Sequence, residues 1–409
     1  MAAGLSAHRA ELARLASLYR RQLLDDVVAF WEKRARDEQF GGLFHHFDRT
    51  GKLTGTDKNI WCQGRMVWMF SALCNRVEKR PTWLAMARSG RDFLVAHAYA
   101  GAGRWHYLLS RSGQVLRSDR SFFTDAFVLT GLAELARASG SDEDRDLIEA
   151  TFQQVARNLE REGFDEFHHF HLDPSRLWHS VSMIGLYVAS VLAPVLGEAR
   201  TRPIADACLH RILHVFARDE LGCLLESVGR DGAVLDDDPG RRINPGHTME
   251  SMWFCMEEAL RRKDRALVQR CIQVIDWACA KGHDPVHGGL FNILDRAGGE
   301  PRGYDPRASF DEGWDDKVWW VHSEALYALL LAAMESGRRD LWERFLELHD
   351  YCQRFLHDPQ HGEWYAYLHR DGSAKVPDKG NWIKAAFHVP RNLMQVMLLL
   401  ERAAAQAAG

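Results

Sequence analysis

Residues 284–288 of this chain have the sequence DPVHG, and residues 358–362 repeat it as DPQHG. Each copy leads into a short cassette made of a glycine, a stretch rich in aromatic or apolar residues, and a polar turn. Four other cassettes keep this pattern without the lead-in, and the six cover residues 42–51, 103–113, 163–174, 222–232, 289–298 and 362–372. Self-similarity at a spacing of about 60 to 70 residues indicates one structural unit repeated along the chain.

The stretches between the cassettes have helical periodicity. Between the second and third cassettes, apolar side chains recur at helical spacing over residues 122–135 and 147–159, and the pattern breaks near Gly140. The cassettes alternate weakly and end in turn residues, which is typical of short β-hairpins. Each repeat is therefore predicted to contain two helices and a hairpin arm.

Six helical pairs can close into a ring. The predicted fold is therefore all-α, an (α/α)6 barrel of six helical-hairpin repeats with short β-hairpin arms. An open α-solenoid has the same periodicity and is the alternative. No linker rich in proline, glycine or serine interrupts the 409 residues, so residues 1–409 are predicted to form a single domain.

Composition and charge exclude several classes of function. The formal net charge is −4, which provides no electrostatic footprint for nucleic acid. Residues 1–28 form an amphipathic pattern without the apolar centre of a signal peptide, and no stretch is apolar enough to span a membrane. The eight cysteines are scattered and form no C-x-x-C pair, as expected of reduced thiols. We therefore expect a cytoplasmic protein with no membrane or nucleic-acid partner.

The sequence contains none of the common cofactor signatures. It has no G-x-G-x-x-G or Walker loop, no H-E-x-x-H motif and no G-x-S-x-G motif. The histidine runs at residues 45–46 and 168–171 fall in predicted hairpins, where neighbouring side chains point to opposite faces. They are therefore predicted to be surface or hairpin histidines, and no metal or cofactor is assigned.

Tryptophan is abundant, with 14 residues in the chain. Flat indole faces beside polar groups suit sugar rings, whose apolar C–H faces are edged by hydroxyls. Any one of these side chains could equally fill the barrel core. The tryptophans that lie near polar candidates are Trp61, Trp68, Trp105, Trp178, Trp253, Trp314, Trp319, Trp320, Trp364 and Trp382. Together they favour a sugar as the ligand.

The sharpest local signal is the sequence RINPGHTMESMW at residues 242–253. Asn244 and Pro245 are predicted to be the N-cap and first residue of a helix, which places His247 in its opening turn. Because a helix N-terminus disfavours imidazolium, His247 is expected to be neutral near pH 7 and able to accept a proton. Glu250 lies on the same helix face. A capping histidine without chemistry would give the same pattern.

A second histidine has a similar place in the last repeat. In the sequence FHVPR at residues 387–391, Pro390 is predicted to start the final helix, with His388 just before it. Two histidines at the mouths of two helices in a toroid can face one cavity, which is the arrangement that a two-base proton transfer requires. Arg65, near another predicted inner helix, can stabilise an oxyanion, although a structural ion pair would explain it equally well.

At these residues the chain resembles the N-acylglucosamine 2-epimerase family. The matching stretches keep the family's order over nearly the whole chain and are residues 41–44, 61–68, 244–250, 284–291, 319–325, 362–364 and 387–391. The resemblance implies an (α/α)6 barrel and a cofactor-free sugar 2-epimerase or aldose–ketose isomerase. It also implies a small-molecule sugar substrate and a possible homodimer.

The resemblance implies roles for individual residues. His247 and His388 would be the acid/base pair, and Arg65 would hold the C1/O1 end of the sugar. The other predicted substrate contacts are Glu250, Trp320, Glu324, Trp382, Asp125 and His179. Two stretches depart from the family pattern: residues 178–183 lack the arrangement of a histidine a few residues beyond an asparagine that some members carry there, and residues 381–386 lack a cysteine found in the N-acetylglucosamine enzymes.

The predicted reaction is a proton transfer on the open-chain sugar. One histidine removes the C2 hydrogen while Arg65 stabilises the enediolate, and the other histidine returns a proton to C2, or to C1 for a ketose product. The predicted substrate pair is N-acetylglucosamine and N-acetylmannosamine. A mannose isomerase, or a 2-epimerase of glucose/mannose or cellobiose, is the alternative on the same scaffold.

Two other classes of protein remain possible from the sequence. A non-catalytic binding protein would need only the helical repeats. A glycoside hydrolase would need two opposed carboxylates, for which the candidates are Asp125, Glu250, Asp315 and Asp316.

The repeat also predicts where the site lies. Arg65, His247 and His388 follow the last glycine of their cassettes by 14, 15 and 16 residues, and Asp125 does so by 12. Equivalent positions in a closed ring lie at one end of the barrel. These side chains are therefore predicted to surround one pocket.

Overall fold

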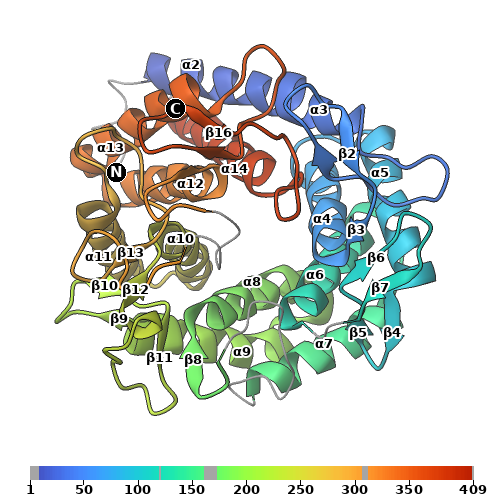
Figure 1. Cartoon of the computed structure of the whole chain (residues 1–409), viewed down its shortest axis with the longest axis horizontal. Helices are drawn as coiled ribbons and strands as arrows, with labels where there is room; N and C mark the ends of the chain where they lie inside the picture. The colour runs from blue at the N-terminus through green and yellow to red at the C-terminus, as the bar shows by residue number, and fades with distance from the viewer. Residues whose placement is uncertain (1–8, 119–120, 161–172, 306–311, 408–409) are drawn as a thin grey trace.

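The computed structural model describes residues 9–118, 121–160, 173–305 and 312–407. Its inner helices form a ring around a central axis, as Figure 1 shows in the view along that axis. Each inner helix contacts the next, and α14 returns to contact α4. The inner helices are α4 (Ile60–Arg76), α6 (Phe122–Ser139), α8 (His179–Leu196), α10 (Pro245–Arg262), α12 (Trp319–Ser336) and α14 (His388–Gln406). The ring is closed, which confirms the (α/α)6 barrel over the open solenoid.

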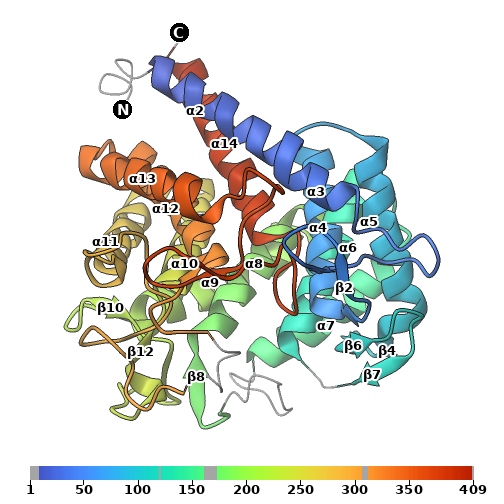
Figure 2. The same ribbon diagram turned by 45° about the horizontal axis from the view of Figure 1, so that its top comes forward.

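An outer helix packs against each repeat of this ring. The outer helices are α2 (Arg9–Arg21), α5 (Pro81–Phe93), α7 (Arg145–Glu160), α9 (Glu198–His210), α11 (Arg265–Gly282) and α13 (Arg339–Tyr351). Four of them continue into π-helical turns, at η2 (Gln22–Val28), η3 (Leu94–Ala98), η4 (Arg211–Phe216) and η7 (Cys352–Leu356), and α3 (Ala29–Glu32) follows η2. Figure 2 shows α2 lying along α14, so the first and last helices close the ring together.

The inner helices are apolar on most faces because protein surrounds them on most sides. In α12, residues Val321 to Met334 are all buried, whereas α13 buries a single stripe. Helix α8 has a mean hydropathy of 1.6 over 18 residues, enough by length and composition to cross a membrane. Since 67% of it is buried inside the barrel, α8 has the burial of a core helix.

Three of the predicted hairpins are present. They pair β1 (His46–Phe47) with β2 (Leu53–Gly55), β6 (Leu108–Leu109) with β7 (Val115–Arg117), and β15 (Tyr367–Leu368) with β16 (Ala374–Val376). A further short pair joins β4 (Tyr99–Gly101) to β5 (Arg104–Trp105). The third predicted hairpin, at residues 163–174, lies almost entirely outside the described residues.

The hairpin prediction is wrong for the fourth and fifth cassettes, whose strands pair outside their own cassette. In the fourth, β10 (Cys223–Leu224) pairs with β9 (Ala217–Arg218), and β11 (Ser227–Gly229) pairs with β8 (Arg176–Trp178). In the fifth, β13 (Leu294–Asp295) pairs with β12 (Arg242–Ile243). The reason is a rule of the whole ring: a strand that leads into an inner helix pairs with the next cassette. The same rule joins β3 (Lys58–Asn59) to β6 and β14 (Lys317–Val318) to β15.

The DPxHG lead-in encodes a buried ion pair. Its aspartate accepts backbone N–H groups of the turn on one carboxylate oxygen and a lysine ammonium on the other. The first cassette is preceded by the same device without the sequence match. The three pairs are Asp37 with Lys58 at 3.0 Å, Asp284 with Lys317 at 2.9 Å, and Asp358 with Lys379 at 2.9 Å. Each lysine lies at or before an inner helix, so the pair fastens the cassette to the ring.

Candidate active site

A cavity of about 320 Å³ lies at the end of the barrel that carries the cassettes. Its walls come from the N-terminal turns of the inner helices and from the connections before them. Five predicted site residues line it, namely Arg65, His247, Glu250, Trp320 and His388. Four tryptophans do so as well, Trp61, Trp178, Trp319 and Trp320. The repeat thus brings side chains separated by more than 300 residues of sequence to one pocket, as predicted.

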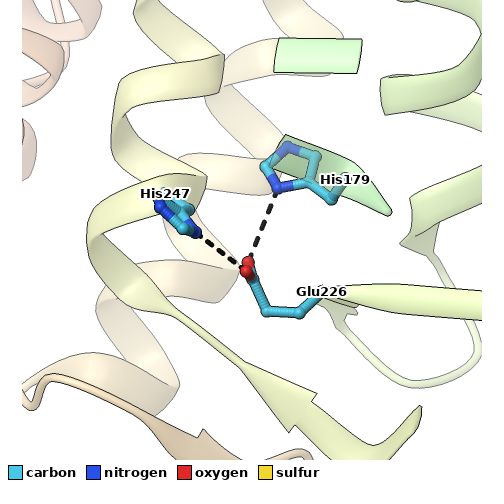
Figure 3. Close-up of side chains that lie close together, drawn as sticks. All are labelled: His179, Glu226 and His247. Atoms are coloured by element: carbon cyan, nitrogen blue, oxygen red, sulfur yellow. Dashed lines mark hydrogen bonds and ion pairs between the residues drawn. The ribbon is translucent and has the colours of Figure 1, made fainter. Parts of the chain in front are cut away.

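His247 is held from two sides. Its backbone N–H donates to the Asn244 side chain at 3.0 Å, so Asn244 and Pro245 are the N-cap and first residue of α10, as predicted. Its Nδ1 lies 2.8 Å from Oε2 of Glu226, as Figure 3 shows. Burial lowers the pKa of His247, but the charge and hydrogen bond of Glu226 outweigh it and raise the pKa above its usual value. The carboxylate of Glu226 thus opposes the effect of the helix end on which the predicted neutral state was based.

Glu226 is a functional residue that sequence reasoning missed. It lies in the fourth cassette, between β10 and β11, and lines the cavity. Burial raises the pKa of its carboxyl group, but the neighbouring imidazoles, His247 above all, lower it to about 2. Its place in a cassette four residues after Gly222 was visible in the sequence. The imidazoles that Glu226 contacts could not be inferred from the sequence. Glu226 comes close to His179 and His247 because β11 pairs with β8, and that pairing was not predicted.

His179 lies behind Glu226 and is fully buried. Its Nε2 is 2.7 Å from Oγ of Ser251, and its Nδ1 is 3.5 Å from Oε1 of Glu226 (Figure 3). Burial lowers the pKa of this imidazole. His179 is not among the residues that line the cavity, so the structure places it in a supporting position and not in the predicted contact with substrate.

His388 is the first residue of α14, so the helix begins two residues earlier than the predicted start at Pro390. Its Nδ1 lies 2.6 Å from Oε1 of Glu324. Burial, and then the positive charge of Arg65, hold the pKa of His388 well below its usual value. Glu324 is fully buried behind the histidine and is absent from the cavity lining, contrary to its predicted contact with substrate.

Arg391 is the second residue that sequence reasoning missed. Its guanidinium is buried and donates to the carboxylates of both Glu250 and Glu324. Glu324 also accepts from Asn392 at 2.7 Å and from Trp253 at 2.8 Å. Arg391 follows His388 by three residues, which is one turn of the helix, and this spacing was the available signal. Its carboxylate partners come from α10 and α12, which no local pattern reveals.

Arg65 lies against three aromatic rings. Its guanidinium carbon is 4.1 Å from the ring centre of Phe127, 4.5 Å from that of Trp61 and 4.8 Å from that of Phe387. Burial lowers the pKa of Arg65 to about 10, so the group stays charged at neutral pH. Within the described residues no carboxylate lies within ion-pair distance of it, and its Nε has no hydrogen-bond partner. The alternative of a structural ion pair is therefore not supported.

Trp320 stands beside both cavity histidines. Its ring centre lies 5.0 Å from that of His247 and 5.9 Å from that of His388. The indole thus provides a flat surface next to two imidazoles that come from different helices. Such a surface suits the apolar face of a sugar ring, with both imidazoles close to it.

Two predicted substrate contacts do not reach the cavity. The carboxylate of Asp125 accepts the backbone N–H of Trp105 at 3.0 Å and so fastens the second cassette to α6. The ring of Trp382 packs near His46 and Tyr107, with ring centres 6.0 and 6.2 Å away. Neither residue is part of the lining given by the described residues.

The remaining hydrolase candidates and one histidine run have other surroundings than predicted. Asp315 and Asp316 are not part of the described lining either. His45 is buried, with Nδ1 3.0 Å from the carbonyl oxygen of Asn381, and is not a surface residue. Residues 168–171 lie outside the described residues.

Two groups of side chains combine the chemistry and spacing of metal ligands. They are His179 with Glu226 and His247, and Glu250 with Glu324 and His388, and the ligand atoms in each group lie within 4.8 Å of one another. In the second group the guanidinium of Arg391 already bridges the two carboxylates. In the first, the contact between Glu226 and His247 has the length of a charge-assisted hydrogen bond. Hydrogen bonds therefore join members of both groups.

The fold and the site define a class of protein: an (α/α)6 barrel with two imidazoles and a guanidinium at one cavity. A family model described as N-acylglucosamine 2-epimerase (GlcNAc 2-epimerase) matches residues 42–389. The chain is 33% identical to the N-acylglucosamine 2-epimerase of Mus musculus over 392 residues, which cover 91% of this chain and 88% of that protein. The chain therefore belongs to the N-acylglucosamine 2-epimerase family and is an isomerase.

Solved structures agree on the fold. The cellobiose 2-epimerase of Spirochaeta thermophila aligns with a TM-score of 0.80 at 20% identity, covering 96% of this chain and 98% of that one. A D-mannose isomerase aligns with a TM-score of 0.81 at 17% identity, covering 93% of this chain and 97% of that one. At these identities the likeness concerns the barrel and not the substrate.

Proposed function

We propose that the protein is a cofactor-independent sugar 2-epimerase that interconverts N-acetylglucosamine and N-acetylmannosamine. The observation that carries the proposal is that His247 and His388 both lie beside Trp320 in one cavity that Arg65 also lines. The identity of 33% to a mammalian N-acylglucosamine 2-epimerase supports this substrate class.

The reaction begins on the open-chain sugar, whose C1 aldehyde acidifies the hydrogen on C2. One imidazole takes this proton, the C–H electron pair forms the C1–C2 double bond, and the carbonyl electrons move to O1. The charged and buried guanidinium of Arg65 stabilises the resulting enediolate oxygen. A proton from the second imidazole then reaches C2 from the opposite face and inverts it.

Nuclear magnetic resonance in D₂O tests this function. The protein is incubated separately with N-acetylmannosamine, N-acetylglucosamine, mannose, glucose and cellobiose. We expect deuterium at C2 of the N-acetylated sugars. A ketose product with deuterium at C1 would indicate an isomerase instead, and cellobiose or mannose as the preferred substrate would correct the substrate class. No exchange with any of these sugars would refute the proposal.

Asparagine variants of the two histidines assign the roles. Since a positioned acid or base contributes about 10²- to 10⁴-fold in rate, H247N and H388N should each lose at least that much activity. H349N is the matched control, because His349 lies on α13 and contacts Tyr19, far from the cavity lining. Near-normal turnover in either cavity variant would exclude that histidine from the reaction.

A further inference from the structure

The two cavity histidines are backed by carboxylates in different surroundings. Glu226, behind His247, faces the imidazoles of His247 and His179, and no lysine or arginine among the described residues forms an ion pair with it. Glu324, behind His388, is bound by Arg391 and by two neutral donors. The negative charge of Glu226 is thus available to His247, while that of Glu324 is already compensated.

We propose that Glu226, supported by His179, is a positioning residue that keeps His247 as the protonated member of the histidine pair while His388 stays neutral. The proposal rests on the proposed function and adds a division of labour to it. In the resting enzyme His388 is the base that takes the C2 proton, and His247 is the acid that returns one. In the reverse reaction the same single proton is on His388, and His247 is the neutral base.

The hydrogen bonds also select the ring atoms that take part. In both histidines Nδ1 is directed at the carboxylate, so Nε2 is the atom left for the substrate. After one turnover His388 carries the proton taken from C2, and His247 has given its own away. The free enzyme regains its resting form when His388 releases a proton to solvent and His247 takes one up.

The charged groups around each ring favour this distribution. Around His247 the nearby charges are the carboxylates of Glu226, Glu250 and Glu324, all of which stabilise the imidazolium. Around His388 the positive groups are Arg65, Arg391 and His247, and the opposing carboxylates are Glu250 and Glu324, the second of which contacts the ring and is also bound by Arg391. Burial disfavours the charge on both rings, and only His247 has an uncompensated carboxylate in direct contact to overcome it.

His179 is the second imidazole that faces the carboxylate of Glu226. Its Nε2 is held by Ser251 at 2.7 Å, and its Nδ1 faces Oε1 of the carboxylate at 3.5 Å. When His247 transfers its proton to C2, Glu226 loses the imidazolium that balanced it. A donor N–H from His179 can then shorten its contact with Oε1 and limit the cost of a buried lone carboxylate.

The variant Glu226→Gln tests the proposal because it keeps the shape of the side chain and removes its charge. Activity requires charged His247, so it is present below the pKa of His247 and is lost as pH rises through it. In E226Q we expect kcat/KM to begin its alkaline fall at lower pH than in the wild type. On the alkaline side of the profile, kcat/KM of E226Q should be at least tenfold below that of the wild type, which corresponds to a change of about one unit in the pKa of His247. At lower pH, the two enzymes should converge.

Three further measurements separate a charge effect from a structural one. E226D, which restores the charge, should move the alkaline limb back toward that of the wild type. E134Q is the matched control, since Glu134 is a buried carboxyl outside the cavity lining that binds Asn75 and Arg137, and it should leave the limb in place. H179F should shift the limb less than E226Q does.

Histidine titration by NMR gives a readout that does not depend on activity. The His247 signal, assigned with H247N, should titrate at lower pH in E226Q than in the wild type. An unchanged titration and an unchanged limb in E226Q would overturn the role of Glu226. Absence of deuterium exchange in the wild type would instead refute the proposed function, so the two failures are distinguishable.

Discussion

Replacing Lys58 by methionine should destabilise the barrel far more than removing the arginine that binds the same aspartate. Asp37 accepts from Lys58 at 3.0 Å and from Arg111 at 2.9 Å. Lys58 and Asp37 have side chains with 0% exposure, whereas that of Arg111 is 37% exposed. The two cations thus share one carboxylate and differ in burial, which makes R111A the matched control for K58M.

The expected magnitudes follow from burial. Breaking a buried pair by removing one partner costs about 3–5 kcal/mol where the remaining charge is left uncompensated, and because Arg111 still binds Asp37 in K58M, this range is an upper limit. A pair with a partly exposed arginine is screened by water and contributes about 1 kcal/mol or less. For a chain of this length those values correspond to a fall in Tm of roughly 3–6 °C for K58M and about 1 °C for R111A.

Urea unfolding and thermal scans at pH 7 and pH 5 measure the effect. Burial alone would raise the pKa of Asp37, but the hydrogen bonds from Arg111 and Lys58 hold it well below its usual value. In K58M a large part of that stabilisation is gone, so Asp37 gains a proton more readily and the loss in stability should be smaller at pH 5. Equal losses in K58M and R111A would show that burial does not decide the strength of these pairs. The copy formed by Lys317 and Arg370 on Asp284 repeats the test.

Two other outcomes are expected from the packing and the cavity. Gly64→Ala should lower stability by at least about 1–3 kcal/mol, because its Cβ would lie 2.6 Å from the backbone of Phe127 where α4 meets α6; an unchanged urea midpoint would contradict this close contact. Arg65→Met should lower kcat by about 10²- to 10³-fold, as loss of an oxyanion donor does, with the fold intact by circular dichroism; a change in KM alone would mean that Arg65 only binds substrate.

The sequence predicts the ring well because each repeat carries its own local signals. The cassette glycines, the apolar periodicity of residues 122–135 and the Asn244–Pro245 helix start are all contained in short segments. The two hairpins that were wrongly predicted show the limit of such signals. Strands of two or three residues have too few side chains to define their own partners, so β11 and β13 pair with the strands that lead into the preceding inner helices, α8 and α10.

The cavity side chains that the sequence predicts are likewise those with local signals. His247, His388 and Arg65 are predicted because each stands at a repeat-equivalent position near a helix start. Glu226 and Arg391 are missed because their importance lies in partners from other repeats. The upward shift in the pKa of His247 could not be predicted for the same reason, since the helix end is local in the sequence and the carboxylate of Glu226 is not.

The buried charges around the cavity explain why the histidine pair should hold one proton. Among the groups whose charges act on the two histidines, two arginines, Arg65 and Arg391, and three carboxylates, Glu226, Glu250 and Glu324, together carry one net negative charge when all are ionised. One proton on the pair makes the set neutral, whereas two protons or none would leave a net charge in a medium of low polarity, which is costly. A two-base epimerisation needs one charged and one neutral imidazole, so the charge balance of the pocket stabilises the form that can react. Removing any one of these five groups should therefore change the ionisation of the pair as well as the contact that the group makes.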